Sequence, residues 1–357
     1  MIITPSLHCG GSEKFVAMVC NNLNTQAYAV CLLVINNANP FYKILNPDIE
    51  IIDLKKSRAL FSLGAIKSAV KKFNPDILFS TANHVNLYLA IFRNHFKRSI
   101  KLIAREASVV SINSQQAKMP LLYSWLIKKY YNRFDLIICQ SAYMQQDLIE
   151  HYNVDDKKTI IIYNAVQKSS KRSFQPDKQT PNRVYKFITV AGLRQEKGIE
   201  RLIHAAGLLS IPFRYYIIGE GNKRKELEKL IVELGLQKAV FLPGEKENPF
   251  DGMEDADLFL MGSYYEGFPN ALLEAGALGI PVIAFDVPGG IAEIITEGEN
   301  GLLIEDNDII AFSSAINRAG FENLNRDAII ESTNKRFAVD RLITQLDDLF
   351  LKLAENK

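Results

Sequence analysis

The segment 263–282 holds the residues whose types and spacing best suit chemistry. A strand is predicted over Leu258–Met261, a Glu-Gly-Phe-Pro turn follows at Glu266–Pro269, and an apolar helix is predicted to begin near Asn270. Helix N-termini present free N–H groups and a partial positive charge. The backbone of the turn Gly267–Asn270 is therefore a candidate phosphate-binding site.

Glu274 is the unusual residue of this segment, because it is the single charged side chain between Gly267 and Phe285. Burying a carboxylate without a partner is costly, so we expect Glu274 to be hydrogen-bonded. A ribose diol offers two hydroxyl donors and would satisfy both carboxylate oxygens. The alternative is an acid that interacts with the start of its own helix.

The elements that must position these residues alternate between strands and helices along the chain. Short apolar runs are typical of strands covered on both faces, and we predict strands at Val30–Ile35, Ile77–Ser80, Lys101–Ala104, Leu136–Cys139, Thr159–Ile162, Phe187–Ala191, Arg214–Ile218, Val240–Leu242, Leu258–Met261 and Val282–Phe285. Amphipathic helices are predicted between them, for example at Gly64–Phe73, Arg194–Leu209 and Lys223–Gly235. This alternation indicates an α/β protein with parallel sheets and helices on both sides.

The polar segment 166–186 interrupts the alternation, as a linker would. We therefore expect two doubly wound, Rossmann-like domains, residues 1–165 and residues 187–337. A last helix, within 338–357, could pack on either domain. Ligands of open α/β sheets collect beyond the carboxyl ends of the strands, so we expect the active site in a cleft across which the two sheets face.

The segment 263–282 resembles the signature of the retaining GT-B glycosyltransferases of family 4 (glycosyl transferases group 1), of the type that builds bacterial cell-envelope polysaccharides. In that signature two glutamates are separated by seven residues, as Glu266 and Glu274 are here. Further blocks match in order and spacing: Gly10–Glu13, Tyr163–Val166, Ile218–Asn222, Gly244–Pro249 and Gly298–Leu303. The likeness covers nearly the whole chain and is densest from Val190 to Ile304.

The resemblance implies a GT-B fold and roles for individual residues. Glu266 would accept hydrogen bonds from the transferred sugar, and Glu274 would hold the ribose. Lys197 and Arg194 would neutralise the diphosphate that leaves; their alternative is a solvated helix start. Arg194 lies only three residues before Lys197, whereas the common family pattern places the arginine five residues before.

The remaining residues of the implied site form loops at strand ends. Gly10 and Gly11 would let backbone N–H groups approach phosphates, although a glycine pair is also common in plain turns. The other implied donor contacts are Gly219, Gly244, Glu245, Gly267, Phe268, Pro269 and Asn270. Residues 1–165 would bind the acceptor and residues 187–337 the nucleotide sugar.

The first domain departs from the family pattern at the loop Ala104–Ser108. Many relatives carry a histidine there near the donor sugar, and this chain has none. Arg105 and Glu106 would line the acceptor side instead, or form a surface ion pair. His84 is a further candidate for the cleft, or a structural histidine.

No metal or redox cofactor is expected. The chain lacks an Asp-x-Asp motif at a strand end, and a lysine with a helix dipole can supply the charge that a metal would. Gly219-x-Gly221 lacks the third glycine of a dinucleotide fingerprint. The four cysteines show no CxxC spacing, which is typical of reduced thiols in a cytoplasmic protein.

The charge distribution points to an anionic partner of the first half. Residues 1–165 hold 19 Lys and Arg against 11 Asp and Glu, a net +8, and the rest of the chain is −6. The segment Leu121–Phe134 is aromatic, amphipathic and cationic, as helices that lie on anionic bilayers are; core packing with solvated lysines is the alternative. No run approaches the roughly 18 apolar residues of a spanning helix, and no signal peptide is recognised.

These features together predict a cytoplasmic enzyme that lies peripherally at the inner face of the plasma membrane. We expect transfer of a sugar from a UDP-hexose or UDP-N-acetylhexosamine to a lipid-linked or saccharide acceptor, with no nucleic-acid partner. The alternatives are a GT-B nucleotide-sugar epimerase and a non-catalytic scaffold of the same fold.

Overall fold

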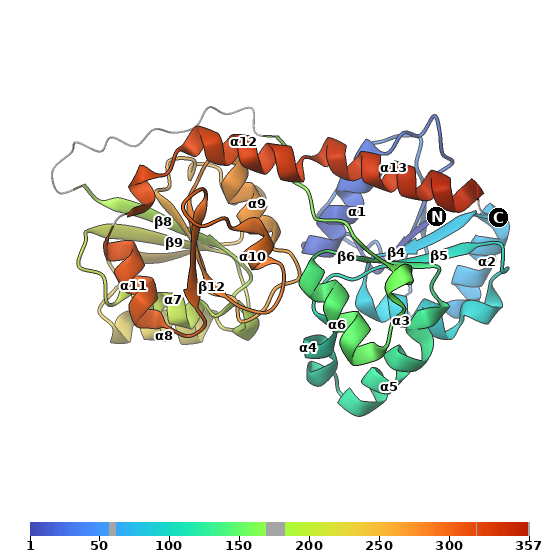
Figure 1. Ribbon diagram of the computed structural model, residues 1–357, viewed down its shortest axis with the longest axis horizontal. Helices are drawn as coiled ribbons and strands as arrows, with labels where there is room; N and C mark the ends of the chain where they lie inside the picture. The colour runs from blue at the N-terminus through green and yellow to red at the C-terminus, as the bar shows by residue number, and fades with distance from the viewer. Residues whose placement is uncertain (57–61, 169–182, 319, 356–357) are drawn as a thin grey trace. The chain divides into compact units, whose positions relative to one another are not determined.

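The computed structural model describes residues 1–56, 62–168, 183–318 and 320–355 (Figure 1). They form two compact units, one made of Met1–Asn164 with Val339–Lys357 and the other of Ala165–Ala338. Much of the predicted linker, residues 169–182, lies outside the described residues. The predicted α/β class with two parallel sheets is confirmed.

Unit 1, which contains both chain ends, is built on a seven-stranded parallel sheet in the order β3-β2-β1-β4-β5-β6-β7. Its strands are β1 Ile2–Thr4, β2 Cys31–Val34, β3 Glu50–Asp53, β4 Ile77–Ser80, β5 Lys101–Arg105, β6 Leu136–Cys139 and β7 Thr159–Ile161. The central strands are buried on both faces, which explains their continuous apolar runs. The edge strand β3 was not predicted, because two of its four residues are exposed, the other two are only partly buried, and both of its ends, Glu50 and Asp53, are charged.

Helices cover both faces of this sheet. They are α1 Gly11–Asn22, α2 Leu63–Phe73, α3 Asn83–Ile91, α4 Val110–Gln116, α5 Pro120–Tyr130, α6 Ala142–Tyr152 and α13 Val339–Glu355. In Figure 1, α1 and α13 lie on one side of the sheet and α3, α5 and α6 on the other. The cationic segment predicted at Leu121–Phe134 is α5 followed by a 3-10 turn at Tyr131–Arg133.

The final helix α13 packs on unit 1. The Phe350 ring lies 5.9 Å from the Phe79 ring and 6.4 Å from the Tyr28 ring, between centroids. The Tyr28 hydroxyl also donates to the carbonyl of Asp347 at 3.3 Å. The last helix therefore contributes to the hydrophobic core of unit 1, which also contains the first residues of the chain.

Unit 2 has a six-stranded parallel sheet in the order β10-β9-β8-β11-β12-β13. Its strands are β8 Tyr185–Val190, β9 Phe213–Ile218, β10 Val240–Gly244, β11 Leu258–Met261, β12 Val282–Asp286 and β13 Gly301–Glu305. Its helices are α7 Ile199–Ala206, α8 Arg224–Glu233, α9 Asn270–Ala277, α10 Ile291–Ile294, α11 Ile309–Asn317 and α12 Arg326–Phe337. The helices α7, α8 and α11 cover one face, and α9, α10 and α12 the other (Figure 1).

The helix predicted over Arg194–Leu209 is shorter than expected. A 3-10 turn at Gln195–Lys197 comes first, and Gly198 separates it from α7. Gly198 has φ +54°, and a Cβ there would overlap the carbonyl oxygen of Gly262. The left-handed glycine therefore allows the start of α7 to touch the end of β11.

The chain crosses between the units twice, after Asn164 and after Ala338. Just inside unit 2, the amide of Val166 donates to the carbonyl of Phe337 at 2.8 Å, and Val166 pairs with Ala338 in a short parallel bridge. The two crossing segments are therefore adjacent.

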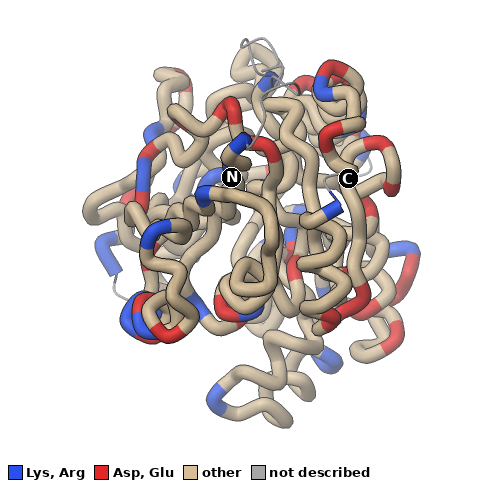
Figure 2. Tube along the Cα trace, turned by 90° about the vertical axis from the view of Figure 1, so that its left-hand side faces the viewer, with Lys and Arg blue, Asp and Glu red and all other residues tan. Residues whose placement is uncertain are grey.

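Charged residues of both signs are distributed along the trace (Figure 2). Among the described residues, no helix combines the length and apolarity needed to span a bilayer.

Candidate active site

The candidate donor site is built at the carboxyl ends of the strands of unit 2. The loop after β8 carries Lys197, and the loop after β11 carries Ser263 and Glu266. Lys197 Nζ lies 2.6 Å from Glu266 Oε1, and the Ser263 hydroxyl donates to the same oxygen at 2.6 Å. The lysine and glutamate side chains remain 19% and 11% exposed. Both donors use Oε1, and no donor to Oε2 is found among the described residues.

The loop that carries Glu266 is held by the loop after β12. The amide of Glu266 donates to the carbonyl of Pro288, and the amide of Gly290 donates to the carbonyl of Gly267, both at 3.0 Å. Gly289, between them, has φ +124°, and a Cβ there would overlap the carbonyl oxygen of Glu266. Gly289 was not among the predicted site residues.

Arg201 in α7 is a second residue that the sequence analysis missed. Its guanidinium is buried and donates from Nε to the carbonyl of Gly262 at 2.6 Å and from Nη2 to the carbonyl of Ser263. Nη1 pairs with Asp306 Oδ1 at 2.6 Å. The arginine thus fixes the end of β11 from which Glu266 projects. The sequence signal that could have identified Arg201 is its position on the apolar face of the predicted helix.

The turn after Glu266 leads directly into α9, as predicted. Pro269 is the N-cap residue and Asn270 the first helical residue, and no side chain at the cap accepts a hydrogen bond within the described turn. Glu274 is half-buried one turn further on, so it shares a helix face with Asn270. The Phe268 side chain is buried against Phe337, with ring centroids 5.6 Å apart.

The remaining predicted donor residues lie at the ends of neighbouring strands. The amide of Gly219, after β9, donates to the carbonyl of Gly244, the last residue of β10, at 2.9 Å. Glu245 follows and is exposed. Arg194 is 59% exposed and pairs with Glu196, from Nε to Oε1, at 2.8 Å. Lys197, rather than Arg194, is thus the cation joined to Glu266.

In unit 1, the predicted glycine pair forms the start of α1, with Gly10 as its N-cap and Gly11 as its first residue. A Cβ at Gly10 would overlap Oε2 of Glu13, so the carboxylate of Glu13 folds back over this glycine. A negative charge near a helix N-terminus is favourable. The group that lies close to Gly10 in this structure is thus the Glu13 carboxylate, where a phosphate had been predicted.

Arg105 and Glu106 do not form a surface ion pair, so that alternative was wrong. Arg105 ends β5, and both side chains are at most 1% exposed. Glu106 Oε1 accepts hydrogen bonds from Asn86 Nδ2 at 2.8 Å and from the Tyr131 hydroxyl at 3.0 Å. Burial raises the pKa of Glu106 to about 7 and lowers the pKa of Arg105 to about 9. His84, near the start of α3, is exposed.

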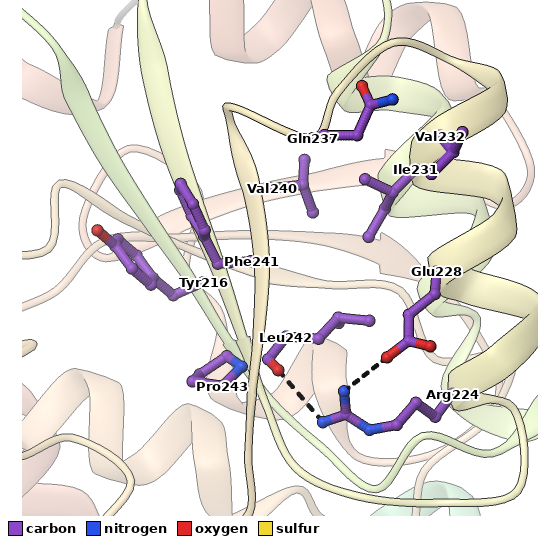
Figure 3. A pocket seen from close by; sticks show the side chains of 10 residues that line it. All are labelled: Tyr216, Arg224, Glu228, Ile231, Val232, Gln237, Val240, Phe241, Leu242 and Pro243. Atoms are coloured by element: carbon purple, nitrogen blue, oxygen red, sulfur yellow. Dashed lines mark hydrogen bonds and ion pairs between the residues drawn. The ribbon is translucent and has the colours of Figure 1, made fainter.

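A separate groove of about 540 Å³ lies between α8 and the edge strand β10 (Figure 3). Its lining is mainly apolar, and Arg224 spans it by hydrogen bonds to Glu228 and to the carbonyl of Leu242. It contains none of the predicted site residues. Within the described residues, no group of three or more His, Cys, Asp or Glu side chains is arranged to hold a metal ion.

Comparison with known proteins identifies a relative over most of the chain. The chain is 29% identical over 320 residues to the N-acetylgalactosamine-N,N'-diacetylbacillosaminyl-diphospho-undecaprenol 4-alpha-N-acetylgalactosaminyltransferase of Campylobacter jejuni, with 85% of each chain covered. Two solved structures share the fold at 18–19% identity and 98% coverage of each chain. They are the lipopolysaccharide outer core galactosyltransferase WaaB, with a TM-score of 0.78, and HepE of Anabaena in complex with UDP-glucose, with a TM-score of 0.79.

Two family models match adjoining parts of the chain. The model "Glycosyltransferase Family 4" matches residues 9–169, and the model "Glycosyl transferases group 1" matches residues 170–336. The resemblance of the motifs is thereby confirmed. The chain belongs to the group 1, family 4 glycosyltransferases, a family of retaining hexosyltransferases with the GT-B fold.

Proposed function

We propose that this chain transfers a sugar, with retention of configuration, from a UDP-hexose or UDP-N-acetylhexosamine to a lipid-linked or saccharide acceptor in cell-envelope polysaccharide assembly. The observation that carries the proposal is the Lys197–Glu266 pair, 2.6 Å apart at the ligand-binding edge of the unit 2 sheet. The name of the Campylobacter relative, which includes a diphospho-undecaprenol acceptor, supports the acceptor class. The HepE complex supports a UDP-sugar donor.

In this proposal, Lys197 and the start of α9 stabilise the diphosphate as it leaves. Departure adds about one negative charge, so both groups act more strongly in the transition state than in the ground state. Glu266 Oε2 accepts a hydrogen bond from the sugar, and Glu274 holds the ribose. Because the Glu266 carboxylate is already bonded to an ammonium and a hydroxyl, it is a poor nucleophile. Departure and attack on the same face of the sugar are therefore favoured.

The same cation makes a metal unnecessary for the proposed reaction. We expect transfer to continue at full rate in a chelator such as EDTA. Loss of activity in EDTA, with recovery on adding magnesium or manganese, would contradict this expectation.

The site assignment is tested by Lys197→Ala and Glu274→Ala. Both should lower transfer by orders of magnitude at unchanged far-UV circular dichroism, and Glu274→Ala should weaken UDP binding measured by calorimetry. Matched controls are Lys229→Ala and Glu226→Ala in α8, whose side chains are 79% and 67% exposed; they should transfer normally. Normal turnover in both site variants would refute the assignment.

The alternative functions give different results in the same assays. An epimerase would convert the nucleotide sugar without releasing UDP, whereas a transferase releases UDP when an acceptor is present. A non-catalytic scaffold would give no calorimetric signal with UDP.

We further propose that unit 1 lies on an anionic membrane through α5 and the residues before it. Apolar side chains there are exposed, and lysines flank them: Met119, Leu121, Leu122 and Trp125, with Lys118, Lys128 and Lys129. Lys129 Nζ lies 4.5 Å from the centroid of the Trp125 ring. Exposed apolar side chains beside cations suit the boundary between headgroups and acyl chains.

Vesicle flotation tests this contact. The protein should float with phosphatidylglycerol vesicles in low salt, and Lys128→Glu with Lys129→Glu should abolish flotation. The matched control is Lys71→Glu with Lys72→Glu, another exposed lysine pair of unit 1. Equal flotation of both double variants would remove the proposed contact.

A further inference from the structure

Arg105 is a buried cation that leaves most of its donors unused. It is 1% exposed, and its guanidinium lies 3.7 Å from the centroid of the Phe15 ring. Nη2 donates to Oδ1 of Asn164. Nε and Nη1 are also buried, yet neither has a hydrogen-bond partner among the described residues.

The charge of this guanidinium is not neutralised by a contacting carboxylate. Among the described residues Arg105 forms no ion pair; burial lowers its pKa, and the charge of Glu106 opposes that shift. The nearby carboxylate of Glu106 is instead bonded to Asn86 and Tyr131. A buried charge without a partner is strongly unfavourable for the folded state.

Arg201, a buried arginine of unit 2, shows how this protein satisfies such a group. Arg201, 2% exposed, uses all three nitrogen atoms, for the carbonyls of Gly262 and Ser263 and for the carboxylate of Asp306. Arg201 therefore has the contacts of a structural arginine. Arg105 is buried to the same degree, but among the described residues its Nε and Nη1 have no hydrogen-bond partner.

Arg105 lies at the edge of its sheet where open α/β sheets commonly bind ligands. It is the last residue of β5, at the carboxyl edge of the unit 1 sheet. Phe15, against which it stacks, belongs to α1, which starts at the same edge after β1. Guanidinium groups form strong, charge-assisted hydrogen bonds to phosphate oxygens.

We propose that Arg105 is the receptor for a phosphate group of a substrate, held through Nε and Nη1. The inference rests on the proposed function, since a nucleotide sugar and a lipid-linked acceptor both carry phosphate. The bound phosphate supplies the negative charge and the hydrogen-bond acceptors that Arg105 lacks among the described residues. The ligand-free protein is then less stable than it could be, as sites kept ready for a ligand commonly are.

The experiment compares thermal unfolding of the full chain as wild type, Arg105→Met and Arg201→Met. Each is heated in chloride, in inorganic phosphate, in pyrophosphate and with UDP, at equal ionic strength. In chloride, Arg105→Met should unfold at the wild-type Tm or above it, whereas Arg201→Met should unfold lower. Pyrophosphate should raise the Tm of the wild type and of Arg201→Met, and its apparent Kd for Arg105→Met should be weaker by roughly tenfold or more.

The UDP arm separates the two sources of phosphate. If Arg105→Met reduces the rise in Tm caused by UDP as well as the rise caused by pyrophosphate, Arg105 binds the donor diphosphate. If UDP still raises the Tm of Arg105→Met as much as that of the wild type, Arg105 binds the phosphate of the acceptor. The inference is overturned if Arg105→Met loses as much Tm in chloride as Arg201→Met. It is also overturned if pyrophosphate fails to protect the wild type or protects Arg105→Met equally. UDP binding that depends on Glu274 would then still support the proposed function.

Discussion

The chemistry at the residue scale depends on which partners each charged group already has. Lys197 contacts Glu266, so a diphosphate that binds there shares an ammonium with a carboxylate. Arg105 has no such carboxylate in contact among the described residues, and Glu106 is buried among neutral donors. Within the described residues, Lys197 of unit 2 is therefore paired with a carboxylate, whereas two nitrogens of Arg105 in unit 1 have no hydrogen-bond partner.

The buried carboxyl of Glu106 predicts a pH dependence of stability. Burial raises its folded-state pKa from 4.5 to about 7, so between these values the folded protein binds a proton that the unfolded chain has released. The free energy of unfolding should therefore fall as pH rises through this window and level off above it. In Glu106→Gln the free energy of unfolding should no longer show this decrease with pH. Above pH 7 the variant should therefore be more stable than the wild type.

Denaturant unfolding followed by tryptophan fluorescence checks this, because the single tryptophan, Trp125, lies in unit 1. The comparison is made at about pH 5 and about pH 8, on either side of most of the titration. Glu150→Gln, an exposed carboxyl of the same unit, is the control. Parallel pH profiles for wild type and Glu106→Gln would contradict the prediction.

At the scale of elements, the donor site depends on loops that are braced by their neighbours. The loop after β11 is held from one side by Arg201 of α7 and from the other by Gly289 after β12. Arg201 donates to the carbonyls of Gly262 and Ser263, and Gly289 lies against the carbonyl of Glu266. Both act through the placement of Glu266.

Arg201→Lys should reduce kcat more than it changes the KM for the donor. Lysine keeps the charge but supplies one nitrogen in place of the three that reach Gly262, Ser263 and Asp306. Glu266 should then lose its position relative to Lys197, and misplacement of a catalytic group by about 1 Å can cost on the order of a hundredfold in rate.

Steady-state kinetics with the donor varied checks this result. Asp306→Asn, which retains an oxygen for Nη1, is the milder companion and should stay within about tenfold of wild type. A purely structural role for Arg201 would instead lower stability and leave kcat per folded molecule unchanged.

The elements show what the sequence could predict. The strands β4, β6 and β11 were predicted to the residue, because each is a buried apolar run bounded by turn residues. The start of α9 and the placement of Lys197 after β8 also followed from local patterns. The family and its fold could be recognised from the motif blocks.

The unpredicted features depend on tertiary contacts between distant segments. The role of Gly289 arises from the carbonyl of Glu266, and that of Arg201 from the end of β11. The strands β3 and β13 lie at sheet edges, where partial exposure weakens the apolar signal. The contact of the Glu13 carboxylate with Gly10 also required the structure, because the glycine pair alone had suggested a backbone open to phosphates.

The whole molecule is one unit inserted into another. Unit 1 is discontinuous in sequence, because α13 supplies Phe350 to a core that otherwise comes from Met1–Asn164. Unit 2 is continuous, and its ends are joined by the pairing of Val166 with Phe337 and Ala338. A continuous unit with adjacent ends has the anatomy of an independently folding domain.

Residues 165–338 expressed alone should therefore fold cooperatively and bind UDP. Calorimetry on this fragment should give a Kd within about tenfold of that of the full chain, if unit 2 supplies most donor contacts. The same fragment with Glu274→Ala is the control and should bind more weakly. A fragment that folds but does not bind UDP would place the main nucleotide contacts in unit 1.

The paired crossing segments also determine how the protein responds to mechanical force. Both chain ends belong to unit 1, so tension applied between them passes first through β1 and the packing of α13. While α13 stays in place, the inserted unit carries no load. Once α13 is stripped away, the tension meets the Val166–Ala338 bridge before it reaches the second sheet. The candidate donor site is therefore expected to carry tension only after α13 and this bridge have given way.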